Sequence, residues 1–206
     1  MLAGFRSAHP DIRLRWVPLS FDRDGSAITD EEVDVALVLP DYQLTGVLTE
    51  ALFEMPVYAC ASIHHPIASR RDVRVEDIAQ DTFPGQHPSV PNAFADLFYL
   101  TALHGRRPTT SASVPLTPDE TWALIASGDA ITTTPAGSWL SCPETIAVRR
   151  VIDAAPFVFR MMWRADASPA VDSFICHMRA RYGSDSAARL LREGGQPHRR
   201  GAIPGP

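Results

Sequence analysis

The fold is indicated first by the stretch VDVALVL at Val33–Leu39. It is a continuous apolar run broken only by Asp34, and it ends at Pro40–Asp41. An apolar run of this length without alternation is typical of a strand that is buried on both faces of a parallel sheet. The stretch therefore predicts a strand of a parallel sheet that other elements cover on both faces.

Helices and further strands alternate on both sides of this run. Helices are predicted where a capping residue opens an apolar stripe and a glycine closes it: Ser89–Gly105, Thr117–Gly128 and Ser168–Gly183. Strands are predicted at Ile12–Leu19, Val47–Glu54, Val57–Ile63, Thr82–Gln86, Thr109–Val114, Ala130–Thr134 and Phe157–Trp163. This alternation predicts an α/β architecture with largely parallel sheets, followed by a disordered tail over Ser184–Pro206.

Composition and charge narrow the class of protein. The 206 residues carry a formal net charge of −5, whereas a broad nucleic-acid binder usually has a basic face. The three cysteines, Cys60, Cys142 and Cys176, lie far apart and form no C-x-x-C pair, which favours reduced thiols over a disulfide scaffold or a zinc site. No apolar run is long enough for a membrane helix, and the N-terminus lacks a signal-peptide core. These features predict a cytoplasmic protein that does not enter a membrane.

Motifs for catalysis, metals and cofactors are missing from the sequence. The adjacent His64 and His65 point to opposite faces of any strand, so they do not jointly hold a metal, and we expect a capping or surface role for them. The sequence has no G-x-S-x-G, no G-x-G-x-x-G and no P-loop. We therefore expect no enzyme activity, no metal and no cofactor.

Two stretches suggest a binding site for a small molecule. PGQHPSVPNAF, at Pro84–Phe94, places main-chain N–H groups and polar side chains before a helix, which suits an anion such as a carboxylate. ITTTPAGSW, at Ile131–Trp139, places Thr133 and Thr134 at the carboxyl end of a strand, where ligands of open α/β sheets bind. The alternative is that these polar residues only cap helices, and the sequence leaves both interpretations open.

The order of the segments resembles the effector-binding domain of LysR-type transcriptional regulators. The similarity covers roughly residues 1–182. No single motif decides it, but the ordered series is fairly specific. The similar stretches are LAGFRSAHPDIRLRW (Leu2–Trp16), VDVALV (Val33–Val38), FEMPVYACASIHHPIA (Phe53–Ala68), VRVEDIA (Val73–Ala79), DETWALIASGDAITTTP (Asp119–Pro135) and FRMMWRADASPAVDSFICHMR (Phe159–Arg179).

The resemblance implies a fold of two Rossmann-like subdomains around a central cleft, as in type II periplasmic binding proteins. Subdomain I would comprise residues 1–80 and 160–183 and subdomain II residues 81–159, with the crossing at Gln80–Asp81. The family's winged helix-turn-helix, its linker helix and the first strand of subdomain I have no counterpart here. We therefore expect an N-terminally truncated chain that contacts operator DNA only through a domain it does not contain.

The resemblance also implies effector-binding positions on the two walls of the cleft. Family members bind a small metabolite there, often a carboxylate, and act as homodimers or tetramers. The positions implied here are Leu39, Pro40, Asp41, Gly85, Gln86, His87, Ser89, Thr133, Thr134 and Pro135. If Asp41 faces the cleft, it disfavours an anion and favours an amine or a hydroxylated ligand, and His87 could tune binding near neutral pH.

Three functions remain in competition at this point. The first is the ligand-sensing domain of a LysR-type regulator. The second is a stand-alone solute-binding protein of the same fold, which the missing signal peptide disfavours. The third is an enzyme that uses His87 with Thr133 and Thr134, which the lack of a nucleophile–base pattern disfavours.

Overall fold

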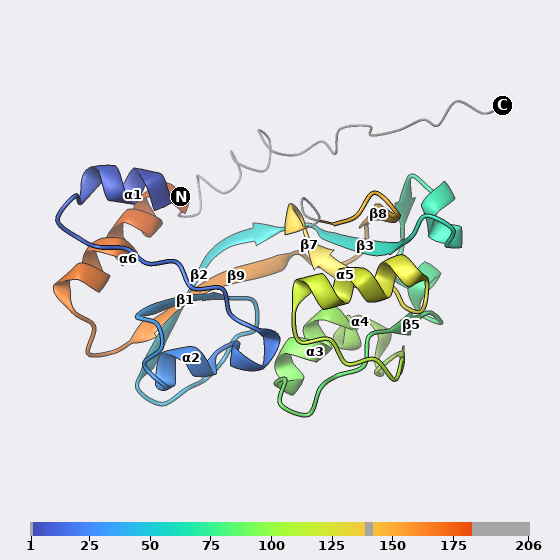
Figure 1. Ribbon diagram of the computed structural model, residues 1–206, viewed down its shortest axis with the longest axis horizontal. Helices are drawn as coiled ribbons and strands as arrows, with labels where there is room; N and C mark the ends of the chain where they lie inside the picture. Colours follow the sequence, from blue (N-terminus) through green and yellow to red (C-terminus); the bar gives the residue numbers. More distant parts are fainter. Residues whose placement is uncertain (1, 139–141, 183–206) are drawn as a thin grey trace.

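The computed structural model describes residues 2–138 and 142–182, which form two α/β lobes joined by long strands (Figure 1). The first lobe contains β1 and the helices α1 (Leu2–Ala8), α2 (Ser26–Thr29) and α6 (Pro169–Tyr182). The second lobe contains β3 to β8 and the helices α3 (Asn92–Phe98), α4 (Thr101–His104) and α5 (Pro118–Ser127). Strands β2 (Val47–Met55) and β9 (Phe157–Arg164) run from the first lobe toward the second.

The sheet of the first lobe has the order β1-β9-β2, with β1 at Val35–Val38. Both neighbours run antiparallel to β9, so that Val35 lies opposite Trp163 and Leu48 also lies opposite Trp163 on the other side. Helix α6 packs on this sheet through Ile175 and Met178, which are buried together with Met161 and Trp163. A strand within the Val33–Leu39 run is therefore confirmed. The prediction that it is buried on both faces of a parallel sheet is wrong, because β1 is antiparallel to β9, lies at the edge of the described sheet and has one face only partly buried.

The sheet of the second lobe has the order β4-β8-β3-β7. Its strands are β3 (Val57–Ser62), β4 (Asp72–Val73), β7 (Thr132–Pro135) and β8 (Ile146–Val151). A separate pair joins β5 (Thr82–Phe83) to β6 (Thr109–Thr110). Short 3-10 turns lie at Phe21–Arg23 (η1), Pro66–Ser69 (η2) and Val75–Ile78 (η3).

The chain changes sheet at Pro56, and not at the predicted crossing of Gln80–Asp81. Strand β2 pairs with β9 in the first sheet, and β3, one residue after it, pairs with β7 and β8 in the second. The return crossing lies between β8 and β9, over residues 152–156. Pro56 lacks the N–H that a strand continuing through it would donate, so a proline is a natural place for this change. Strands β3 and β4 therefore pair in the second sheet, before the predicted crossing, and the predicted subdomain boundaries stay a prediction.

Most strand pairs are antiparallel, although the sequence analysis predicted largely parallel sheets. Strands β3 and β9 enter the sheets in the direction opposite to their neighbours because the chain crosses between lobes twice. Among the strand pairs of the described residues, only β4–β8 and β5–β6 are parallel. The strand–helix alternation indicated the fold class correctly but did not determine the direction of these crossing strands.

The predicted strand at Ile12–Leu19 is an extended segment without a ladder partner. Its side chains alternate from Ile12 to Arg15 as in a strand, but the hydrogen bonds of its backbone N–H groups to other backbone groups are limited to Ile12 N–H to the carbonyl of His9. The outer edge of β1 is also unpaired in the described sheet. The alternation was correctly detected, but a strand needs a neighbour at hydrogen-bonding distance, and the segment has none among residues 2–138 and 142–182.

Local capping signals are confirmed in part. The Thr117 hydroxyl accepts from the N–H of Glu120 at 3.3 Å at the start of α5, and Gly128 ends that helix with φ +88°. The predicted helix Ser89–Gly105 instead starts at Asn92 and is interrupted at Leu100, which has a left-handed backbone. The predicted tail, Ser184–Pro206, lies outside the described residues.

His65 has the capping role that the sequence suggested. Its ring Nδ1 accepts from the N–H of Ile67 at 3.4 Å at the start of η2, and its Nε2 lies 3.2 Å from Asp81. His64 is exposed. The described residues contain no group of three His, Cys, Asp or Glu side chains that could hold a metal ion.

Candidate functional site

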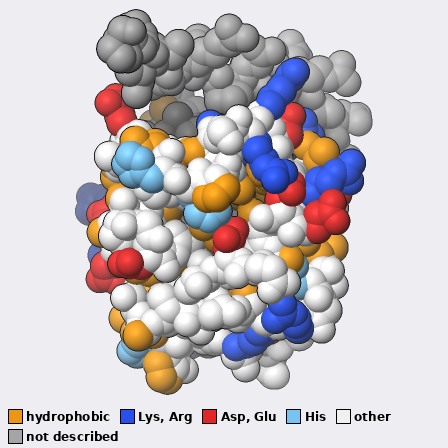
Figure 2. All heavy atoms as spheres, turned by 90° about the vertical axis from the view of Figure 1, so that its right-hand side faces the viewer, with side chains coloured by type: hydrophobic (Ala, Val, Ile, Leu, Met, Phe, Trp, Pro, Cys, Tyr) orange, Lys and Arg blue, Asp and Glu red, His pale blue; other side chains and the backbone are white. Residues whose placement is uncertain are grey.

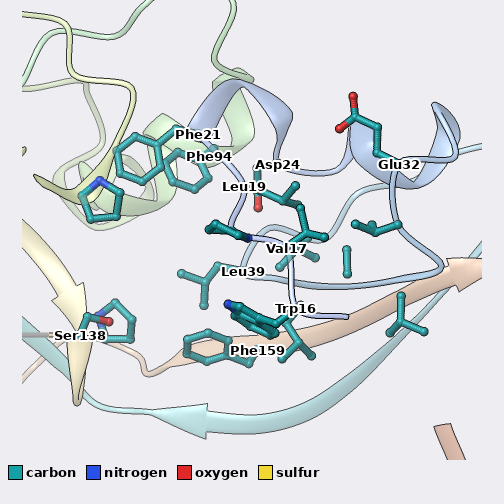
Figure 3. A pocket seen from close by; sticks show the side chains of 18 of the residues that line it. Trp16, Val17, Leu19, Phe21, Asp24, Glu32, Leu39, Phe94, Ser138 and Phe159 are labelled. Carbon is teal, nitrogen blue, oxygen red and sulfur yellow. The ribbon is translucent and has the colours of Figure 1, made fainter. Parts of the chain in front are cut away.

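A cavity of about 730 Å³ lies where the two lobes meet (Figure 3). The first lobe contributes the extended segment that includes Trp16, Val17 and Leu19, together with β1. The second lobe contributes the Pro84–His87 loop, helix α3 and strand β7. The volume falls within the range of small-molecule sites, which usually have apolar walls and a few polar groups.

Seven of the ten residues that the sequence analysis assigned to the site line this cavity: Leu39, Gly85, Gln86, His87, Thr133, Thr134 and Pro135. The other three, Pro40, Asp41 and Ser89, are not among its lining residues. The structure therefore brings most of the predicted positions together from separate elements. That they contact an effector remains a prediction.

The hydroxyl of Thr133 is already used within the protein. It donates to the main-chain carbonyl of Phe98 at 2.5 Å, and the residue is only 1% exposed. Thr134 is buried as well and lies opposite Tyr58 in the β3–β7 ladder. The donor of Thr133 thus ties β7 to the end of α3, and a ligand would have to compete with this bond.

The loop at Gly85–Gln86 is held by its own hydrogen bonds. The Gln86 amide donates to the carbonyl of Val90 at 2.7 Å, and its oxygen accepts from Arg107 at 2.7 Å. Gly85 donates to the carbonyl of Ser113 at 2.7 Å, and a Cβ there would lie 2.6 Å from the carbonyl oxygen of Ser111. Only glycine fits this close approach of two backbones, so the loop forms a preorganised wall of the cavity.

His87 offers the cavity a hydrogen-bonding ring nitrogen. Its Nδ1 accepts from the N–H of Ser89 at 3.2 Å and lies 2.6 Å from the Ser89 hydroxyl. In the neutral ring this acceptor role leaves the proton on Nε2. Ser89 therefore orients His87 and does not cap the following helix as the sequence predicted.

The side chain of Asp41 is not among those that line the cavity. Its carboxylate lies 3.4 Å from Arg160, and its side chain is 53% exposed. An exposed carboxylate paired with arginine contributes little field inside the cavity. The argument that Asp41 sets the charge preference of the ligand is therefore not supported by its position.

A different carboxylate lines the cavity, that of Asp24 at the end of η1. The hydroxyl of Tyr42 donates to Asp24 Oδ2 at 2.8 Å. Burial raises the pKa of the Asp24 carboxyl to about 6, and the Tyr42 hydrogen bond opposes part of this rise. This pair could not be predicted from the sequence, because 18 residues separate its members and Asp24 lies in a stretch typical of a polar turn.

Aromatic rings connect the wall of the cavity across the two lobes. Phe21 and Phe94 lie 5.0 Å apart between ring centroids, Phe94 and Phe98 lie 4.7 Å apart, and Phe98 and Phe157 lie 5.3 Å apart. The N–H of Phe21 also donates to the carbonyl of Leu116 at 2.9 Å. The turn around Phe21 thus belongs to the first lobe and contacts the second.

The face at the end of the second lobe is not a basic surface of the kind that nucleic-acid binding requires. At the end of the second lobe, basic and acidic side chains are interspersed (Figure 2). Among the described residues, no helix is long and apolar enough to cross a bilayer. The cavity is therefore the feature of the described chain that best explains a function.

Comparison with known proteins points to the same fold and to a family of substrate binding domains. The family described as "LysR substrate binding domain" matches residues 1–183. The effector binding domain of BenM with its effector benzoate is similar with a TM-score of 0.72 and 17% identity, over 90% of this chain and 86% of that chain. The effector binding domain of QuiR in complex with shikimate gives 0.72 and 15%, over 89% and 88%.

Two further solved structures extend the comparison. The regulatory domain of CcmR from Synechocystis PCC6803 in complex with 2-PG has a TM-score of 0.70 and 13% identity, with 89% of both chains covered. Full-length BenM gives 0.71 and 16%, over 89% of this chain but 62% of that chain. No curated protein matches. The predicted α/β fold, two lobes around a cleft as in type II periplasmic binding proteins, is confirmed.

Proposed function

Because the chain belongs to the LysR substrate binding domain family, we propose that it binds a small-molecule effector in the cavity between its lobes. The single observation that carries this proposal is the cavity of about 730 Å³, whose walls come from both lobes. A ligand that contacts both walls stabilises the arrangement in which they face each other. The binding free energy can then shift the equilibrium between conformations of the whole protein.

We further propose that the chain is the sensing part of a transcriptional regulator. The chain spans 62% of full-length BenM and 65% of full-length CbnR in the structure of CbnR with its target DNA. DNA binding and control of transcription would thus belong to a longer protein, in which this chain sets the ligand dependence. We also propose a cytoplasmic location and assembly as a dimer or tetramer.

The family is one of binding domains and not of enzymes, which favours sensing over catalysis. It also favours a regulator over the stand-alone solute-binding protein considered above. The hydrogen bond of Thr133 agrees with a binding role, because its hydroxyl donates to the main-chain carbonyl of Phe98 and not to a base. We propose that the ligand leaves the cavity chemically unchanged.

A thermal-shift screen tests the binding proposal. The panel contains small carboxylates, amines and hydroxylated ring compounds. A ligand at one hundred times its Kd stabilises the folded state by about 2.7 kcal/mol, which for a chain of this size raises Tm by roughly 5–10 °C. The variant His87→Ala removes a polar group of the cavity wall and should reduce the shift, whereas Asp129→Asn on the surface should not. A panel without any hit would contradict the proposal.

A further inference from the structure

Of the acidic residues that line the described cavity, Asp24, Glu32 and Asp34, Asp24 is the one that is not exposed. In Figure 3 it lies beside Leu19, next to the ring pair of Phe21 and Phe94, whereas Glu32 points away from these residues. Glu32 is exposed and holds Arg23 at 2.6 Å. The carboxylate that a ligand in this part of the cavity would meet is therefore that of Asp24.

The hydrogen-bonding capacity of Asp24 is mostly unused. An ionised carboxylate offers about four acceptor sites, and the hydroxyl of Tyr42 is the one side-chain donor to Asp24 within residues 2–138 and 142–182. No cation of that part of the chain compensates its charge. Arg23, the next residue, is bound by Asp30 and Glu32 at 2.7 and 2.6 Å. A partly buried anion in this state attracts a donor from whatever occupies the cavity.

The backbone holds the Asp24–Tyr42 pair in place. Gly25 has φ +86°, and a Cβ at this position would lie 2.8 Å from the ring of Tyr42. The ring therefore packs directly against the turn, and its hydroxyl is fixed on one oxygen of Asp24. This orientation leaves the other oxygen, Oδ1, as the acceptor that no described side chain uses.

The other charged groups of the cavity do not neutralise Asp24. Arg13 and Arg15 line the cavity, but both are exposed. His87 lies on the wall formed by the second lobe and is oriented by Ser89. Asp22, two residues before Asp24, accepts from the hydroxyl of Ser20 at 2.5 Å. The part of the cavity around Leu19, Phe21 and Phe94 thus combines apolar rings with a single negative group.

We propose that the Asp24–Tyr42 pair is the recognition point of this cavity and selects ring-shaped ligands that carry a hydrogen-bond donor, an ammonium or a hydroxyl group. The proposal rests on the proposed function and adds the chemical class of the effector. An ammonium group places a positive charge against Asp24, and a hydroxyl group places a neutral donor there. A carboxylate on the same ring brings a second negative charge to a site of low dielectric constant and is disfavoured.

Three probes of equal ring and similar size test this selection: benzylamine, benzyl alcohol and benzoate. Their affinities are measured by isothermal titration calorimetry with the full chain at pH 8, where Asp24 is ionised. Loss of a hydrogen bond to a charged group costs roughly a factor of ten or more in affinity. We expect benzylamine and benzyl alcohol each to bind at least about tenfold more tightly than benzoate.

Two variants separate the charge of Asp24 from its neighbours. Asp24→Asn keeps the shape and an acceptor oxygen, and it should weaken benzylamine by about tenfold, weaken benzyl alcohol less, and strengthen benzoate. Tyr42→Phe keeps the ring against Gly25 and leaves the carboxylate, so the preference for benzylamine should remain. Asp129→Asn is the matched surface control and should leave the ratios unchanged.

The possible results distinguish this inference from the proposed function. Tighter binding of benzoate in the unaltered chain, or ratios unchanged in Asp24→Asn, would overturn the role of Asp24 while leaving a ligand-binding domain. Absence of binding by all three probes together with a hit elsewhere in the screen would also overturn the inference. Absence of any ligand in the whole screen would contradict the proposed function itself.

Discussion

Replacing Asp24 by asparagine should stabilise the protein at neutral pH. The unperturbed carboxyl has a pKa of 3.8, and burial raises it to about 6 in the folded state. A difference of about two pKa units corresponds to about 3 kcal/mol, which is an upper bound because the side chain is only partly buried. Asparagine carries no charge at any of these pH values and can still accept the hydrogen bond from Tyr42, so it avoids this cost.

The sign of the pH dependence follows from the direction of the shift. Because the folded state holds the proton of Asp24 more tightly than the unfolded chain does, the free energy of unfolding falls as the pH rises from about 4 to about 6. Above the folded pKa the loss is complete. The advantage of Asp24→Asn should therefore be small at pH 4 and reach at most about 3 kcal/mol at pH 7–8.

Urea unfolding, followed by circular dichroism at several pH values between 4 and 8, measures this difference. Asp129→Asn removes an exposed carboxylate and should change the free energy of unfolding by less than about 0.5 kcal/mol throughout. Equal stability of Asp24→Asn and the unaltered chain at pH 4 and pH 8 would refute the reasoning, because it would mean that Asp24 is fully solvated.

Three further predictions concern the elements around the cavity. Thr133→Val should cost about 1–3 kcal/mol in urea unfolding even without a ligand, because the carbonyl of Phe98 loses its donor; an unchanged midpoint would show that the bond contributes nothing. Amide hydrogen exchange should be faster in β1 than in β3, since β1 has an unpaired edge and β3 is paired on both sides; equal protection would contradict this. Gly25→Ala should destabilise the folded state by about 2 kcal/mol or more, because the alanine would have a positive φ and its Cβ would clash with the Tyr42 ring. Gly46→Ala has a positive φ but open space around it, and it should cost about 1 kcal/mol. Equal costs in urea unfolding would show that the clash with Tyr42 contributes nothing.

The parts of the fold that were predicted correctly depend on short-range signals. VDVALVL became β1, and the capping residue Thr117 and the closing glycine Gly128 delimit α5 as expected. Phe157–Trp163 became part of β9. In each case neighbouring residues alone favour the element, so no tertiary contact was needed to predict it.

The parts that were missed depend on distant neighbours. The alternation at Ile12–Leu19 fits a strand. Whether the segment forms a hydrogen-bonded ladder depends on its position relative to the edge of β1, which neighbouring residues in the sequence do not determine. Pro56 ended one strand and began the next in the prediction, yet nothing local shows that the two strands belong to different sheets. Most of the cavity positions were found through the ordered series of segments, whereas Asp24 could not be found because its partner lies in another loop.

The position of Asp24 links the proposed ligand to the arrangement of the lobes. Asp24 belongs to the same turn as Phe21, whose N–H donates to Leu116 and whose ring packs on Phe94, both in the second lobe. A ligand donor bound to Asp24 therefore holds the segment of the first lobe that contacts the second. Such a ligand favours the conformation in which these contacts exist, and its differential affinity sets how far the equilibrium moves. The carboxylate of Asp24 lowers stability because no cation among the described residues compensates its charge. A ligand that compensates this charge would thus couple binding to the arrangement of the two lobes.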